Sequence, residues 1–167
     1  YRVPLAGGSA VKLNGVMNAD GDVESFRISP DSTRVVYHAD QQTDLTYELY
    51  SVPLAGGAAV RVSDPLVPQG DVDLYAITPD SDFVVYRADR DVDGQYELFR
   101  GSILGGAGDA VCLTGDPASG GWVPSFFLHP DSHQVIFVAT PEGVERYELY
   151  VGDPCILCDG FENSSCN

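Results

Sequence analysis

Short apolar runs recur along the chain and are separated by turn-forming residues. The stretch before the first Pro-Asp-Ser turn carries apolar side chains at Val23, Phe26 and Ile28, separated by polar residues. An unbroken Val-Val-Tyr run follows the turn at 35–37. The first pattern predicts a half-buried β-strand, and the second predicts a strand that is covered on both faces. Gly or Pro interrupts nearly every window that is long enough for an amphipathic helix, so the chain is predicted to be all-β.

This pattern occurs three times. Each copy contains a Pro-Asp-Ser turn, an apolar run and then a Tyr-Glu-Leu motif. The turns lie at 30–32, 79–81 and 130–132. The Tyr-Glu-Leu motifs lie at 47–49, 96–98 and 147–149. Self-similarity at such a spacing is typical of a repeat architecture.

Each repeat predicts four short strands. One strand precedes the turn, a second follows it, and a third begins at Tyr-Glu-Leu. An Ala-Gly-Gly turn then leads into a fourth strand over 59–62, and Gly56 and Gly57 can take the positive φ that this turn requires. A four-stranded antiparallel meander of about 40 to 50 residues is typical of a β-propeller blade.

The segments ISPDSTRVVYHADQQTDLTYELYSVPL (28–54) and ITPDSDFVVYRADRDVDGQYELFRGSI (77–103) resemble the WD-like repeats of TolB-type β-propellers. In place of the Ser-Pro-Asp-Gly turn of that family, this chain has the sequences SPDS, TPDS and HPDS. The resemblance covers 1–151, with blades at about 1–54, 55–103 and 104–151, and leaves 152–167 as a separate tail. Such propellers serve as periplasmic scaffolds, binding modules and gating domains of serine peptidases.

Counting the strands predicts an open arc of three blades. Tyr1–Leu5 and Ala10–Leu13 match a third and a fourth strand, whereas the last repeat, Trp122–Val151, lacks its fourth. Such an exposed edge is a template for pairing. The chain is then either a fragment of a longer propeller or a protein whose copies complete one another head to tail, in a closed ring or a filament.

In the second hypothesis, residues 1–13 leave their own arc and add to the last blade of a neighbouring copy. A rival is that residues 155–158 fold back and cover this edge within one chain. The residues expected at the self-association contact are Tyr1, Val3, Leu5, Val11, Leu13, Trp122, Tyr147, Leu149 and Val151.

The tail GDPCILCDGFENSSCN resembles a Cys and Asp-Gly-Phe-Glu terminus of some secreted proteobacterial proteins. The chain has four cysteines, Cys112, Cys155, Cys158 and Cys166. An even number in a chain that looks exported predicts disulfides and a secreted or periplasmic location, and we expect Cys112 to pair with Cys155 and Cys158 with Cys166 among three connectivities. A zinc site is the alternative, because Cys155 and Cys158 have ligand spacing.

The loop ADRDVDGQYE at 88–97 is a candidate calcium site. It offers carboxylates at Asp89, Asp91, Asp93 and Glu97 and the carbonyl of Gln95. Calcium takes six to eight oxygen ligands, and the spacing resembles the hairpin calcium loops of integrin-type propellers. The loop therefore predicts one bound calcium ion. The alternative is an ordinary Asp-Gly hairpin turn.

The charge balance limits the range of partners. Nine Lys and Arg stand against 25 Asp and Glu, and the net charge of −16 disfavours nucleic acid and anionic membrane surfaces. No apolar stretch approaches the roughly 20 residues that span a bilayer.

No G-x-S-x-G motif occurs, and His38, His129 and His133 stand where the other repeats carry different residues. We therefore expect no enzyme. The chain is predicted to be a non-catalytic extracellular or periplasmic structural protein that associates with copies of itself. The alternatives are a fragment of a TolB-like binding or scaffold propeller and the gating domain of a serine peptidase.

Overall fold

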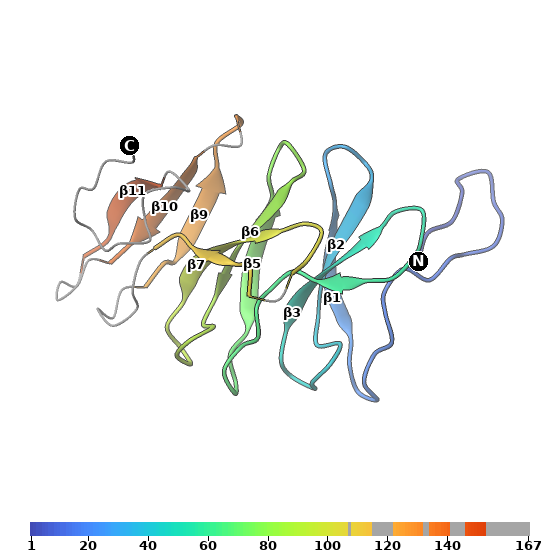
Figure 1. The fold of residues 1–167 in the computed structure, drawn as a ribbon, viewed down its shortest axis with the longest axis horizontal. Coiled ribbons are helices and arrows are strands. Elements are labelled where there is room, and N and C mark those ends of the chain that lie inside the picture. Colours follow the sequence, from blue (N-terminus) through green and yellow to red (C-terminus); the bar gives the residue numbers. More distant parts are fainter. Residues whose placement is uncertain (107, 115–121, 132–133, 141–145, 153–167) are drawn as a thin grey trace.

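The computed structural model describes residues 1–106, 108–114, 122–131, 134–140 and 146–152. These residues form eleven β-strands and no helix. The strands make three antiparallel sheets that stand side by side along the molecule (Figure 1). The prediction of an all-β chain with antiparallel, propeller-like sheets is confirmed, while the open arc of three blades, completed between copies or part of a larger propeller, stays a prediction.

Each sheet is a meander in which neighbours in the sequence pair in space. The first sheet contains β1 (Val23–Ile28), β2 (Arg34–Ala39), β3 (Glu48–Pro53) and β4 (Val60–Arg61). The second contains β5 (Val72–Ile77), β6 (Phe83–Ala88), β7 (Glu97–Ser102) and β8 (Val111–Cys112). The third contains β9 (Ser125–Leu128), β10 (Val135–Ala139) and β11 (Glu148–Gly152).

The fourth strand belongs to the sheet that precedes the Ala-Gly-Gly turn. Tyr50 pairs with Arg61 and Ser51 with Val60, so the first sheet extends to residue 61. The expected ranges 1–54, 55–103 and 104–151 divide the chain before this strand. Each of the later two ranges therefore holds the fourth strand of the sheet before it.

Each sheet carries a row of three aromatic side chains across its first three strands. The rows are Phe26, Tyr37 and Tyr50; Tyr75, Tyr86 and Phe99; and Phe126, Phe137 and Tyr150. The last two rings of each row stack with centroids 5.4 to 5.6 Å apart. Such pairs contribute about 0.5–1.5 kcal/mol beyond their buried area.

The Pro-Asp-Ser turns are built as the sequence predicts. The Asp31 carboxylate accepts hydrogen bonds from Ser29 Oγ (2.6 Å) and from the Thr33 N–H (3.0 Å), and the first of these holds the pKa of Asp31 below its ordinary value. Asp80 accepts the equivalent bond from the Asp82 N–H. Ser32 and Ser81 take positive φ angles of 61° and 68°, at the position where the TolB-type turn has Gly.

Candidate interaction site at the two end sheets

Consecutive sheets are joined by the same contact at both internal seams. The Val72 N–H donates to the Tyr47 carbonyl (2.9 Å), and the Val123 N–H donates to the Tyr96 carbonyl (3.1 Å). Val72 and Val123 hold equivalent places in the second and third repeats, as do Tyr47 and Tyr96 in the first and second. The chain therefore builds one type of sheet-to-sheet interface twice.

Each sheet has two faces with different roles at these seams. We call the face that packs on the preceding sheet the leading face, and in the second sheet it carries Val72 and Tyr75. We call the face that receives the next sheet the trailing face, and in the first sheet it carries Val36 and Leu49. Between the second and third sheets, Val85 and Leu98 provide the trailing face. The leading face there consists of Val123, Val135 and Phe137.

The leading face of the first sheet is exposed along β1, whereas Val35 and Tyr37 of the same face are buried. Val23 is 41% exposed and Phe26 67% exposed, whereas the equivalent Val72 and Tyr75 of the second sheet are 1% and 8% exposed. Beside these residues lies a groove of about 480 Å³. Its walls come from β1 and β2 and from residues 1–3 and 13–14. The first sheet thus presents an apolar surface of the kind that is buried in the next repeat.

The trailing face of the third sheet is exposed as well. Leu149 is 72% exposed, although the equivalent Leu49 and Leu98 are completely buried. Phe127, Tyr147 and Val151 are also exposed on this face. Large contiguous apolar surfaces of this kind usually mark an interaction site.

The exposed trailing face is more apolar than its buried equivalents. At one position of the second strand the three sheets carry His38, Arg87 and Val138, and at one position of the first strand they carry Arg27, Ala76 and Phe127. At one position of the third strand the three sheets carry Ser51, Arg100 and Val151. His38, Arg87 and Ser51 are thus buried polar groups on covered faces, and the third sheet carries Val138 and Val151 at their positions. Arg27 is exposed, as Phe127 is.

On the covered faces, the charged groups have partners across or beside the seam. Arg87 forms an ion pair with Asp73 and donates hydrogen bonds to the carbonyls of Val123 (2.8 Å) and Pro124 (2.7 Å). Its guanidinium also lies over the rings of Tyr96 and Trp122. Arg87 therefore ties the second sheet to the third.

His38, the equivalent of Arg87, lies between the first and second sheets. Its Nδ1 is 2.9 Å from a Glu24 oxygen, and its ring lies near those of Tyr47 and Tyr75. Nε2 is buried without a hydrogen-bond partner among the described residues. His129 lies in the third turn, where Nδ1 contacts Asp131, and His133 is outside the described residues. The two described histidines thus lie in unrelated places.

The structure places the expected self-association residues in three locations. Tyr1, Val3 and Leu5 are exposed near the leading face of the first sheet, where Leu13 packs against the sheet itself. Tyr147, Leu149 and Val151 lie on the exposed trailing face of the third sheet. Trp122 lies near Tyr147, with centroids 6.1 Å apart, and faces the internal seam at Arg87. Val11 pairs with Arg2.

Sequence reasoning missed four residues of these faces, namely Val23, Phe26, Ile28 and Phe127, which are exposed apolar side chains. The first three were interpreted as ordinary core positions of a strand. Their place in the first repeat was the available signal, because their equivalents in later repeats are covered by the preceding sheet.

The acidic loop of the second repeat has an internal structural role. Asp89 is buried and accepts hydrogen bonds from the N–H groups of Asp71 (2.5 Å) and Gly94 (2.8 Å). Asp91 forms an ion pair with Arg90 (2.7 Å). Asp93 and Gln95 lie in the loop, and Glu97 is buried at the start of β7. Within the described residues, no three His, Cys, Asp or Glu side chains come together as a metal site, and calcium binding stays a prediction.

The first and third repeats contain the same clasp. Asp40 accepts hydrogen bonds from the N–H groups of Asp22 (2.6 Å) and Leu45 (3.1 Å). Burial opposes ionisation of Asp40, but these N–H groups outweigh it and hold its pKa below the ordinary value. Thr140 Oγ1 accepts the bond from the Trp122 N–H (3.0 Å) in the third repeat. The clasp fixes the start of each sheet to the end of its second strand.

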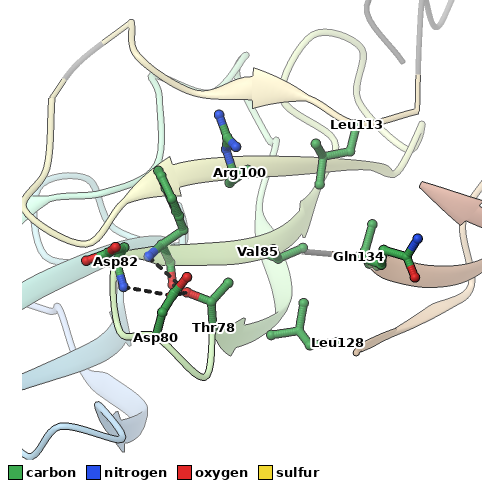
Figure 2. A pocket seen from close by; sticks show the side chains of 10 residues that line it. Thr78, Asp80, Asp82, Val85, Arg100, Leu113, Leu128 and Gln134 are labelled. Carbon is green, nitrogen blue, oxygen red and sulfur yellow. Dashed lines mark hydrogen bonds between the residues drawn. The ribbon is translucent and has the colours of Figure 1, made fainter. Parts of the chain in front are cut away.

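A smaller hollow of about 270 Å³ lies at the seam between the second and third sheets. Figure 2 shows Asp80 and Asp82 at one side, Arg100 above, and Val85, Leu128 and Gln134 along the seam. Arg100 stacks on the ring of Phe83 at 4.4 Å. The described lining contains no His or Cys, and the Asp80 carboxylate is engaged in its turn. This hollow is a packing feature of the seam.

The cysteine predictions fall mostly outside the described residues. Cys155, Cys158 and Cys166 lie there, so neither the expected pairing nor the zinc alternative is tested. Cys112 is half-buried in β8, with Sγ 3.9 Å from Glu97 Oε1 and 3.8 Å from Thr114 Oγ1. The described part of the chain contains no helix that is long and apolar enough to cross a membrane.

No family model and no curated protein matches this sequence. Among solved structures, that of a prolyl endopeptidase is similar, with a TM-score of 0.56 and 17% sequence identity. The match covers 81% of this chain but 21% of that one, so this chain spans about a fifth of the solved protein. At this identity the similarity concerns the fold alone, and it supports a propeller-like, all-β architecture for this chain.

Proposed function

We propose that this chain is a non-catalytic structural protein that associates with copies of itself, head to tail, through its two end sheets. The trailing face of the third sheet of one copy packs on the leading face of the first sheet of the next. The observation that carries this proposal is the 72% exposure of Leu149, whose equivalents Leu49 and Leu98 are completely buried by the next sheet.

The composition of the two faces supports the same conclusion. Fully burying a Leu or Phe side chain contributes about 1.5–3 kcal/mol, and these faces offer Phe26, Ile28, Phe127 and Leu149 in exposed positions. A face that remained in water would gain nothing from carrying Val138 in place of His38 or Arg87, and Val151 in place of Ser51 or Arg100. These replacements favour a face that is covered by a partner sheet.

The geometry of the two faces defines the kind of assembly. The faces differ from each other, so the contact is heterologous and leads to a closed ring or an open filament. Completion of the third sheet by a strand of the neighbouring copy belongs to the same proposal. The secreted or periplasmic location rests on the cysteines and the tail, and it is part of the proposal too.

Size-exclusion chromatography with light scattering tests this function. The intact chain is expected to form species larger than its 17.9 kDa monomer as its concentration rises. Leu149→Asp places a charge on the trailing face and is expected to give monomers, since burying an unpaired charge is costly. Leu104→Asp is the matched control, because Leu104 is 67% exposed but lies after β7 of the middle sheet. Equal masses for both variants would contradict the proposal.

A second candidate is that the three sheets form part of the propeller of a peptidase. The fold similarity to the solved prolyl endopeptidase favours it. An antibody against this chain would then isolate, from the natural source, a polypeptide larger than 17.9 kDa that cleaves a proline-containing peptide. Isolation of an inactive polypeptide of 17.9 kDa would contradict this candidate.

A further inference from the structure

Residues 1–13 reproduce the third and fourth strands of a sheet. Arg2 and Val11 exchange two backbone hydrogen bonds, from the Arg2 N–H to Val11 (2.8 Å) and from the Val11 N–H to Arg2 (2.7 Å). The same pairing joins Ser51 with Val60 and Arg100 with Val111. Arg2–Val11 is therefore the equivalent pair one repeat earlier.

The connecting turn has the same conformation in all three places. Gly7 and Gly8 have φ angles of 92° and 135°, and Gly56 and Gly57 have φ angles of 100° and 138°. The Gly7 N–H donates to the Pro4 carbonyl (2.9 Å), as the Gly56 N–H does to Pro53 (2.8 Å). Residues 1–11 thus fold as a strand pair of the repeat.

Leu13 holds this pair against the first sheet. Its equivalents Val62 and Leu113 are buried at the two internal seams, where each packs on the sheet that follows. Leu13 packs in the same way against the buried cluster of the first sheet that contains Val35 and Tyr37. Residues 10–13 therefore already lie where the fourth strand of a preceding sheet belongs.

Among the described residues, the third sheet has no fourth strand. Its described strands follow the order β11-β10-β9, which leaves β11 at an edge. Val151 in β11 is equivalent to Ser51 and Arg100, the residues that pair with the fourth strand in the other two sheets. An unpaired edge binds an added strand through backbone hydrogen bonds.

We propose that β11 of a second copy displaces Tyr1–Leu5 and pairs with residues 10–13, placing Val151 opposite Val11. This inference rests on the head-to-tail association proposed above and names the strands that meet. Tyr1–Leu5 is then a stand-in that occupies the docking edge until a partner arrives. Tyr1 and Val3 are 83% and 53% exposed, so few packing contacts hold this segment in place.

This arrangement differs from the sequence-based expectation that residues 1–13 leave their own arc. Leu13 keeps its contact with the first sheet, and the segment that moves is Tyr1–Leu5. Tyr1, Arg2 and Val3 also line the groove on the leading face, so their displacement opens this groove for the trailing face of the partner.

Two proline variants test the exchange, because proline has no N–H to donate. Arg2→Pro removes the hydrogen bond from the Arg2 N–H to Val11 but leaves the Val11 edge intact, so self-association should strengthen, by up to about tenfold for one competing backbone hydrogen bond. Val11→Pro damages the edge itself and should weaken self-association by about the same factor. Analytical ultracentrifugation measures both dissociation constants. Deletion of residues 1–5 is a second variant that should act as Arg2→Pro does.

The outcomes separate this inference from the proposed function. If the intact chain associates and Leu149→Asp abolishes association, but both proline variants match the intact chain, the strand exchange is wrong and the face-to-face docking stands. If the intact chain and the deletion variant both stay monomeric, the proposed function and this inference fail together.

Discussion

Leu49 and Leu149 occupy the same position in the first and third sheets, and Leu49 is completely buried while Leu149 is 72% exposed. Leu49 packs in a cluster with residues of the second sheet. The third sheet lies at the end of the row of described sheets (Figure 1). Val23 and Val72 show the reverse relationship at the other end, with exposures of 41% and 1%. The two ends of the molecule therefore expose positions that a neighbouring sheet covers at the two internal seams.

The Asp40 clasp predicts a dependence of stability on acid. The pKa of Asp40 lies below its ordinary value of 3.8 in the folded state, so this carboxyl stabilises the fold fully above about pH 4, and the stabilisation is lost as the pH falls through the folded pKa. Asp40→Asn should lower the free energy of unfolding by about 1–3 kcal/mol at neutral pH, because one backbone N–H loses its acceptor. The difference in free energy of unfolding between Asp40→Asn and the unchanged chain should become smaller below about pH 4.

Urea unfolding between pH 2 and 7 measures this effect. Asp44→Asn, in the exposed part of the same loop, is the control and should leave the stability unchanged. A gap between Asp40→Asn and the unchanged chain that does not depend on pH would show that the clasp is not the cause.

Arg87 is predicted to be the main polar tie between the second and third sheets. Arg87→Ala leaves the carbonyls of Val123 and Pro124 without their donor, and it should lower the free energy of unfolding by about 2–4 kcal/mol. Arg87→Lys should restore only part of the lost free energy of unfolding, because the lysine ammonium can donate hydrogen bonds but cannot reproduce the planar guanidinium fork. Arg146→Ala is the exposed control. Equal stability of Arg87→Ala and Arg146→Ala in denaturant titrations would contradict this role.

The repeat number, the meander order and the turns could be predicted from the sequence, because the Pro-Asp-Ser and Gly-Gly turns and the apolar strands are local signals. The clasp could not be predicted, because the Asp89 carboxylate accepts its hydrogen bond from the N–H of Asp71, 18 residues away. In addition, the spacing of Asp89, Asp91 and Asp93 resembled a calcium loop. On the end faces, Val23, Phe26, Ile28 and Phe127 were also missed. Whether Phe26 is covered depends on a neighbouring sheet, which a strand pattern does not reveal.

Calorimetric titration tests whether the loop at 89–97 binds calcium. The sequence predicts saturable uptake of one ion by calcium-stripped protein. Asp91→Ala should abolish this uptake, because it removes a predicted ligand. It should not unfold the loop, because Asp91 faces solvent and takes no part in the clasp. Asp44→Ala is a control from the equivalent loop of the first repeat. Absence of heat at millimolar calcium would leave the loop as an acidic turn held by Asp89.

The redox state of the cysteines is measurable by intact mass. We predict that Cys112, Cys155, Cys158 and Cys166 are all in disulfides, so alkylation without a reductant should add no mass and alkylation after reduction should add four groups. Four adducts without reductant would contradict the prediction. One bound zinc ion would favour the alternative of a tetrahedral site.

The most direct test of head-to-tail docking mixes two variants that are each blocked at one end. Phe26→Asp blocks the leading face and Leu149→Asp blocks the trailing face, so each variant alone should be monomeric at 17.9 kDa. An equimolar mixture retains one intact leading face and one intact trailing face, and light scattering should show a heterodimer that grows no further. A mixture that stays monomeric while the intact chain associates, or a single variant that still forms larger species, would contradict docking through these two faces.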